Sequence, residues 1–154
     1  MSYQEKKSLT NIISSILITG IYSLVIYQKY LNGSFDTSNI FRFWAIIILI
    51  FIPISIVARI IIMIVFHVLE SVVQTAKGEE VDLDMDITDE RDKLIEMKAA
   101  KISMMVFALG FVIALAVQLL DVSNHSFFII MIFAGFLSEV VSDTLSIIYY
   151  RKGV

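Results

Sequence analysis

Four long apolar runs dominate the chain, and each is long enough to cross a lipid bilayer as a helix. A membrane-spanning helix needs roughly 20 predominantly apolar residues. The chain is 58% hydrophobic with a mean hydropathy of +0.84, against the roughly 45–50% apolar residues of soluble domains. The sequence therefore predicts an all-α, four-transmembrane-helix antiparallel bundle in a single transmembrane domain, residues 1–154. Its expected spans are about 9–29, 41–69, 99–120 and 127–150.

The residue types that are missing exclude several kinds of site. Without cysteine the chain has no disulfide, no thiol nucleophile and no thiolate metal site. It shows no basic nucleic-acid-binding face. It also has no Ser-His pair, no two-histidine metal motif and no phosphate-binding glycine loop. We therefore expect a protein that is not an enzyme and that uses no cofactor, no metal and no nucleic acid.

Three charged residues lie inside the apolar runs. Glu139 and Asp143 are four residues apart, so on a helix they share one face. Charge inside a membrane span is rare and costly and usually faces the bundle interior. At about 1.5 Å per residue, Asp143 lies roughly 24 Å beyond Phe127, Arg59 lies roughly 24 Å beyond Phe43, and Glu139 is at about 18 Å. This spacing favours Arg59 with Asp143 as the ion pair.

Serines of the other two runs reach a similar depth when they are counted from the opposite side of the membrane. The sequence thus predicts an intramembrane polar cluster shared by all four helices. Two alternatives stay open: the charges can reach the interface independently, or a partner chain can pair with them. The expected cluster consists of Arg59, Glu139, Asp143, Ser14, Ser15 and Ser103.

Two further features concern helix geometry. Pro53 falls near the middle of the second run and cannot donate its backbone hydrogen bond, so it predicts a kink. The kink either fits the packing of the bundle or acts as a hinge. Gly110 and Ala114 form a stripe of small residues in the third run, which is typical of closely packed membrane helices.

Residues 72–98 form the one substantial polar stretch, which we interpret as a cytoplasmic acidic loop followed by a helix extension. From Gly78 to Ile87, aspartates alternate with apolar residues, a period that favours extended chain. The aspartate spacing resembles the start of a calcium loop, but the glycine and the terminal glutamate of such a loop are missing. Thr88 is the expected N-cap of a helix that continues without a break into the third span.

The polar residues next to the third span carry a resemblance. Asp-Glu-Arg-Asp followed by Leu-Ile-Glu-Met-Lys-Ala is similar to a motif before the third span in a family of small, uncharacterised prokaryotic four-helix integral membrane proteins. The resemblance implies a four-span architecture and carries no activity with it. It involves Asp89, Glu90, Arg91, Asp92, Ile95, Lys98 and Ala99.

His67 and Glu70 lie one helical turn apart at the far end of the second run. This spacing would suit two metal ligands, but a histidine-based metal site normally needs several convergent ligands. No second histidine lies nearby in the sequence, so we interpret His67 as a histidine at the membrane interface.

The basic residues predict the orientation of the chain. With four spans, both termini and the central loop share one side, and the opposite loops carry only Lys29 and Arg42. The positive-inside rule therefore places both termini and the central loop in the cytoplasm, in a multi-pass protein of the cell (inner) membrane. The residues on that side are Lys6, Lys7, Lys77, Arg91, Lys93, Lys98, Lys101, Arg151 and Lys152.

Two functions fit these features. The first is a small non-enzymatic protein that senses, regulates or scaffolds, with the lipid bilayer around it and a cytoplasmic protein partner bound through residues 78–98. The alternative is a proton- or ion-coupled transporter that uses Glu139 and Asp143, with Pro53 as its hinge. Four spans make a thin wall for a pore, so transport would require self-association, at least a homodimer.

Overall fold

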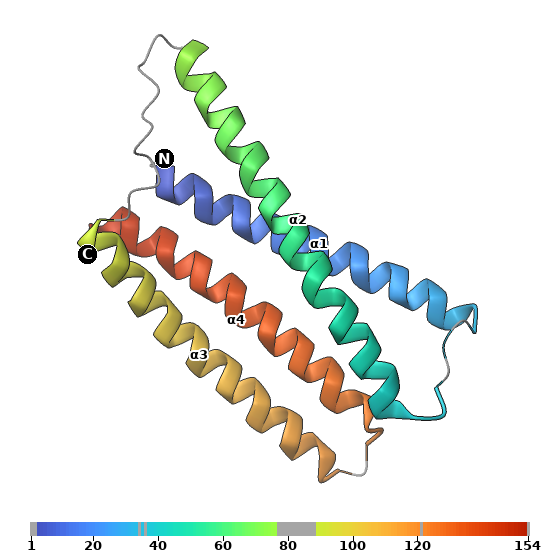
Figure 1. Ribbon diagram of the computed structural model, residues 1–154. Coiled ribbons are helices and arrows are strands. Elements are labelled where there is room, and N and C mark those ends of the chain that lie inside the picture. Colours follow the sequence, from blue (N-terminus) through green and yellow to red (C-terminus); the bar gives the residue numbers. More distant parts are fainter. Residues whose placement is uncertain (1–2, 34, 36, 77–88, 121, 154) are drawn as a thin grey trace.

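The computed structural model of the protein describes residues 3–33, 35, 37–76, 89–120 and 122–153, and all the regular secondary structure in these residues is helical. Each of the four helices is long and apolar enough to cross a membrane, as expected for a multi-pass membrane protein. The predicted all-α class is thereby confirmed. The helices are α1 (Tyr3–Leu31), α2 (Ile40–Ala76), α3 (Glu90–Gln118) and α4 (His125–Lys152) (Figure 1).

Local sequence signals set several helix ends. After α1, the N–H of Gly33 bonds to the carbonyl of Tyr30, and Gly33 has a φ of 66°, a conformation that glycine adopts without a Cβ penalty. Gly153 closes α4 in the same left-handed region. The N-cap of α3 is Asp89, whose carboxylate accepts from the N–H of Glu90. The choice of Thr88 was therefore wrong by one residue, since the aspartate next to it satisfies that N–H.

Helix α3 is continuous from Glu90 to Gln118, which confirms that the charged helix runs into the third span without a break. The acidic stretch Gly78–Ile87 and its expected extended conformation lie outside the described residues.

Helix α4 is central, because it packs along α3 on one side and along α1 on the other. The approach of α3 and α4 depends on small residues, as expected for membrane helices. Ala114 and Ala134 are buried, and a Cβ added at Gly110 would overlap the Cβ of Ala134. The small-residue stripe of the third run is therefore a packing surface.

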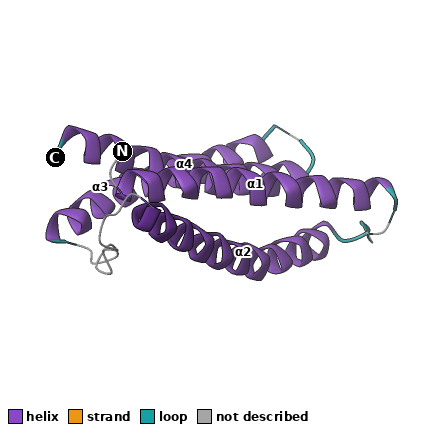
Figure 2. Ribbon diagram, turned by 90° about the horizontal axis from the view of Figure 1, so that it is seen from above, coloured by secondary structure: helices purple, strands orange, loops and turns teal. Residues whose placement is uncertain are grey.

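Helix α2 lies apart from this layer. It packs along α1, crossing it in Figure 1, and follows a bent path on one side of α1 and α4 in Figure 2. Pro53 lies inside it, as the predicted kink requires, while the use of that bend as a hinge stays a prediction. With 37 residues, α2 is about 55 Å long, well beyond the roughly 30 Å of a hydrocarbon core.

Large apolar side chains cover the outside of the four helices. Leu49 is 68% exposed and Met104 is 75% exposed, and many isoleucines and leucines resemble them. An apolar surface of this extent would be an aggregation liability in water. In a bilayer it is the surface that faces the acyl chains.

Candidate functional site

An ion pair joins α2 to α4 in the middle of the apolar region. The Arg59 guanidinium donates through Nη1 to the Glu139 carboxylate. Its other terminal nitrogen, Nη2, lies 3.3 Å from the hydroxyl oxygen of Ser15, a fully buried residue of α1. One guanidinium therefore connects three helices. Its charge is balanced by a carboxylate, as expected for ions placed among apolar side chains.

The expected pairing of Arg59 with Asp143 was wrong, because the two helices are offset by about one turn relative to the assumed alignment. That alignment placed Phe43 level with Phe127. In the structure, Trp44 contacts His125 instead. Arg59 follows Trp44 by 15 residues and Glu139 follows His125 by 14, so Glu139 is the carboxylate at the level of the guanidinium.

Asp143 faces α1 instead. The Asn11 side chain lies beside the Asp143 carboxylate, and both line the same cavity, while Arg59 is close enough to act on Asp143 electrostatically without pairing. Asn11 and Ser15 are four residues apart on α1, as are Asp143 and Glu139 on α4. Two matched faces therefore meet. Asn11 was not among the predicted cluster residues, although its four-residue spacing from Ser15 matches that of Glu139 and Asp143.

The remaining predicted cluster residues behave differently from one another. Ser14 is buried, but its hydroxyl bonds to the carbonyl of Asn11 in its own helix. Ser103 of α3 is half-buried and makes no hydrogen bond to the charged side chains in the described part of the chain. The described contacts of the cluster thus come from α1, α2 and α4, not from all four helices.

A polar cavity of about 240 Å³ lies beside Asp143, between α1, α3 and α4. It extends along α1 from Asn11 towards Gln4, that is, towards the end of the molecule at which both termini lie (Figure 1). Its wall carries oxygen and nitrogen groups as well as carbon. The lining residues are Gln4, Lys7, Ser8, Asn11, Glu96, Ala100, Ser142, Asp143, Ser146 and Tyr150.

The same end of the molecule holds α1 to α2 by two polar contacts. Lys6 forms an ion pair with Glu70. One turn away, the Tyr3 hydroxyl lies 2.8 Å from Nδ1 of His67. His67 and Glu70 therefore each contact α1. No group of three or more metal-ligating side chains occurs among the described residues.

Contacts to α3 and α4 complete this polar end. Gln4 Nε2 lies 3.5 Å from the Asp92 carboxylate, which also lies beside the Tyr150 side chain. Arg151 Nε lies 3.9 Å from the Glu5 carboxylate. In the charged motif Asp89, Glu90, Arg91, Asp92 and Lys98, Asp92 thus contacts two helices, Asp89 caps α3 and Lys98 is exposed.

An aromatic cluster holds the opposite end of α2 to α4. The Trp44 indole N–H donates to Nδ1 of His125 at 3.0 Å, and the Trp44 ring stacks on Phe128 at 5.6 Å between centroids. Because indole can only donate, His125 accepts through Nδ1 and carries its proton on Nε2. Phe41 packs edge-on against Phe128.

No family model matches the chain, and no curated protein or solved structure matches it significantly. The functional argument therefore starts from geometry. The described contacts provide a charge-compensated link between α2 and α4, a polar cavity next to a carboxylate, and a polar end that joins the helices.

Proposed function

We propose that this chain is a small, non-enzymatic integral membrane protein of regulatory, sensing or scaffolding type, built as an antiparallel four-helix bundle. One observation carries the proposal: the Arg59–Glu139 ion pair joins α2 to α4, although α2 packs along α1. An ion pair between loosely packed helices has two discrete states, since it is either formed or separated. Such two-state contacts are what regulatory membrane proteins bias.

The helix containing Arg59 leads directly to the charged segment. Helix α2 continues from Arg59 to Ala76, and α3 begins at Glu90. These two helix ends fix where the segment between them starts and finishes. A change at Arg59 would therefore alter the geometry at which residues 78–98 are presented to a cytoplasmic protein.

The orientation in this proposal follows the basic residues. Both termini and the segment after Ala76 lie in the cytoplasm, and the bundle lies in the cell (inner) membrane. A phosphatase reporter, active only outside the cytoplasm, fused after Lys152 should be inactive, and the same reporter inserted after Gly33 should be active. The reverse result would contradict the orientation.

The resemblance in the motif at Asp89–Asp92 agrees with this architecture. In the structure this motif starts α3 and, through Asp92, contacts α1 and α4. We propose that the motif fixes the start of α3 relative to α1 and α4.

The proposal is tested by in-cell cross-linking of the full chain, followed by identification of the linked proteins. Deletion of residues 78–88 spares the cap and the first turn of α3, and should remove a specific partner. Replacement of residues 35–38 by Gly-Ser repeats alters the loop at the opposite end and should not. Glu139→Gln should change the yield of the same cross-link. A partner set that is identical in all of these variants would rule out the regulatory proposal.

A second candidate, a proton- or ion-coupled transporter, is favoured by the polar cavity that reaches Asp143. It predicts that water reaches Asp143 from the end with the termini. Because the chain lacks cysteine, single cysteines can be placed at Ser146 in the cavity and at Ser23 outside it. The transporter requires labelling at Ser146 by a charged thiol reagent and pH-dependent flux in liposomes that Asp143→Asn abolishes.

A further inference from the structure

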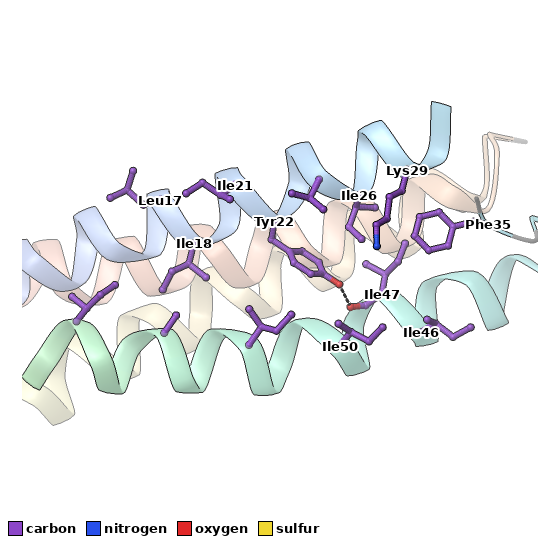
Figure 3. A pocket seen from close by; sticks show the side chains of 14 residues that line it. Leu17, Ile18, Ile21, Tyr22, Ile26, Lys29, Phe35, Ile46, Ile47 and Ile50 are labelled. Atoms are coloured by element: carbon purple, nitrogen blue, oxygen red, sulfur yellow. Dashed lines mark hydrogen bonds between the residues drawn. The ribbon is translucent and has the colours of Figure 1, made fainter. Parts of the chain in front are cut away.

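An apolar groove runs between α1 and α2, and neither Arg59 nor Glu139 lines it. Its volume is about 590 Å³, within the roughly 300–1,000 Å³ of small-molecule sites. Figure 3 shows side chains of both helices turned towards the space between them. The α2 wall alone extends from Ile46 to Ile62, a length of about 24 Å. Typical wall residues are Leu17, Ile21, Val25, Ile46, Ile50 and Ile54.

One cation lies at one end of this groove. Among the described residues that line the groove, Lys29 is the one with a charge, and in Figure 3 its side chain extends from α1 towards α2 beside Phe35. Its ammonium group has no ion pair or hydrogen bond to any residue that the structure describes. The other polar lining group, the Tyr22 hydroxyl, already donates to the carbonyl of Ile47 at 2.7 Å. The unsatisfied polar group of the groove is therefore a positive charge.

We propose that this groove binds an acyl chain of an anionic phospholipid and that Lys29 pairs with the phosphate of that lipid. Lys29 lies two residues before the end of α1, where a lysine side chain reaches the headgroup region of a membrane. An acyl chain that starts beside Lys29 would run along the isoleucines of α2 towards the membrane centre. The charge at one end and the apolar length behind it match the two parts of such a lipid.

The charge also decides between a lipid and a second copy of the chain. In a two-fold symmetric dimer the same surface meets itself, so two grooves placed face to face would bring two Lys29 side chains together. No carboxylate that could compensate them occurs among the described residues that line the groove. A phosphate supplies the missing negative charge, and a flexible acyl chain fits an uneven wall of branched side chains.

Native mass spectrometry of the full chain tests the proposal with two lipids of identical acyl chains, phosphatidylglycerol and phosphatidylcholine. The wild-type chain should retain phosphatidylglycerol preferentially. Lys29→Gln should reduce that preference about five-fold, the factor associated with one lysine near an anionic lipid surface. Arg42→Gln is the matched control. Arg42 lies near the start of α2, at the same end of the molecule as Lys29, but it does not line the groove. This variant should leave the preference unchanged.

A second variant tests the apolar part separately. Ile50→Trp fills the groove and should reduce retention of both lipids, with Leu49→Trp, outside the groove lining, as the control. Added inorganic phosphate should not displace the lipid, because it lacks the acyl chain. Equal retention of both lipids by the wild-type chain, or a dimer lost only in Ile50→Trp, would overturn the proposal, the latter by identifying a second copy as the occupant. Because Lys29 is remote from Arg59, failure here leaves the regulatory proposal intact.

Discussion

Glu139 accepts a hydrogen bond from Arg59, although Asp143 lies one helical turn away on the same helix. The two carboxylates therefore have separate surroundings: Glu139 pairs with Arg59 of α2, and Asp143 lies beside Asn11 of α1. Helix α4 thus uses one polar face to hold two neighbours. The link to α2 matters more for the position of α2 relative to α4, because α2 otherwise packs along α1.

The first prediction concerns the contribution of this ion pair to the free energy of unfolding. Glu139→Gln leaves the guanidinium without its counter-ion among apolar groups, so the free energy of unfolding should fall by about 1–3 kcal/mol. Arg59→Gln should cost a similar amount. The double variant should be more stable than either single variant, because neither the guanidinium nor the Glu139 carboxylate is left without its partner.

Thermal unfolding in detergent measures this cycle. Ser103→Ala is the control, since Ser103 makes no hydrogen bond to the charged side chains in the described part of the chain, and it should have little effect. Strictly additive losses in the double variant would mean that the two side chains act independently.

The second prediction compares this pair with Lys6–Glu70 at the end of the bundle with the termini. The exposed fractions of the Lys6 and Arg59 side chains are similar, 36% and 38%, but Lys6 lies at the polar end of the bundle, where water and salt screen the interaction. Pairs of this kind contribute roughly 0.2–1 kcal/mol. Lys6→Gln should therefore lower the unfolding temperature less than Glu139→Gln.

The dependence on ionic strength distinguishes the two ion pairs further. Raising the ionic strength should weaken the effect of Lys6→Gln, because exposed pairs are screened, and should leave the effect of Glu139→Gln nearly unchanged. Equal salt sensitivity in both variants would argue that Arg59 and Glu139 are in contact with bulk water.

The third prediction uses the single tryptophan of the chain as a reporter of α2. Trp44 contacts His125 and Phe128 of α4, and it lies 15 residues before Arg59 in the same helix. His125→Leu removes the acceptor of the Trp44 N–H and should shift the emission of Trp44. If the ion pair positions α2 as a unit, Glu139→Gln should shift this emission in the same direction. Ser103→Ala should leave the spectrum unchanged. A destabilised Glu139→Gln protein with wild-type fluorescence would show that the ion pair acts only locally.

Much of the fold could be predicted from sequence, since helix formation in lipid depends on the length and composition of each segment. Four apolar runs therefore identified four helices, and the polar residues from Asp89 onwards identified the extension of α3. Helix ends were predicted less accurately. Thr88 and Asp89 are both good caps, and only local geometry decides between them.

The candidate site was predicted in its composition but not in its contacts. Counting residues gives the depth of Arg59 and Asp143 along their own helices. It does not give the offset between α2 and α4, which the contact of Trp44 with His125 sets. An offset of one turn was enough to exchange Asp143 for Glu139. Similarly, the depth of Ser103 could not show that its hydroxyl makes no bond to the cluster.

The last prediction concerns the close approach of α3 and α4. Gly110→Ala places a methyl group where it overlaps Ala134 Cβ. Neither atom belongs to a flexible side chain, so the helices themselves must separate. Overpacking of this kind costs roughly 1–3 kcal/mol. Gly20→Ala is the matched control, because a Cβ at Gly20 meets nothing within 4 Å, and alanine has the higher helix propensity. Unfolding in detergent should therefore show a loss of stability for Gly110→Ala and none for Gly20→Ala. Ala134→Gly should partly restore the Gly110→Ala protein, since it removes the atom that is overlapped. Equal stability of the two glycine variants would mean that α3 and α4 are not held together at Gly110.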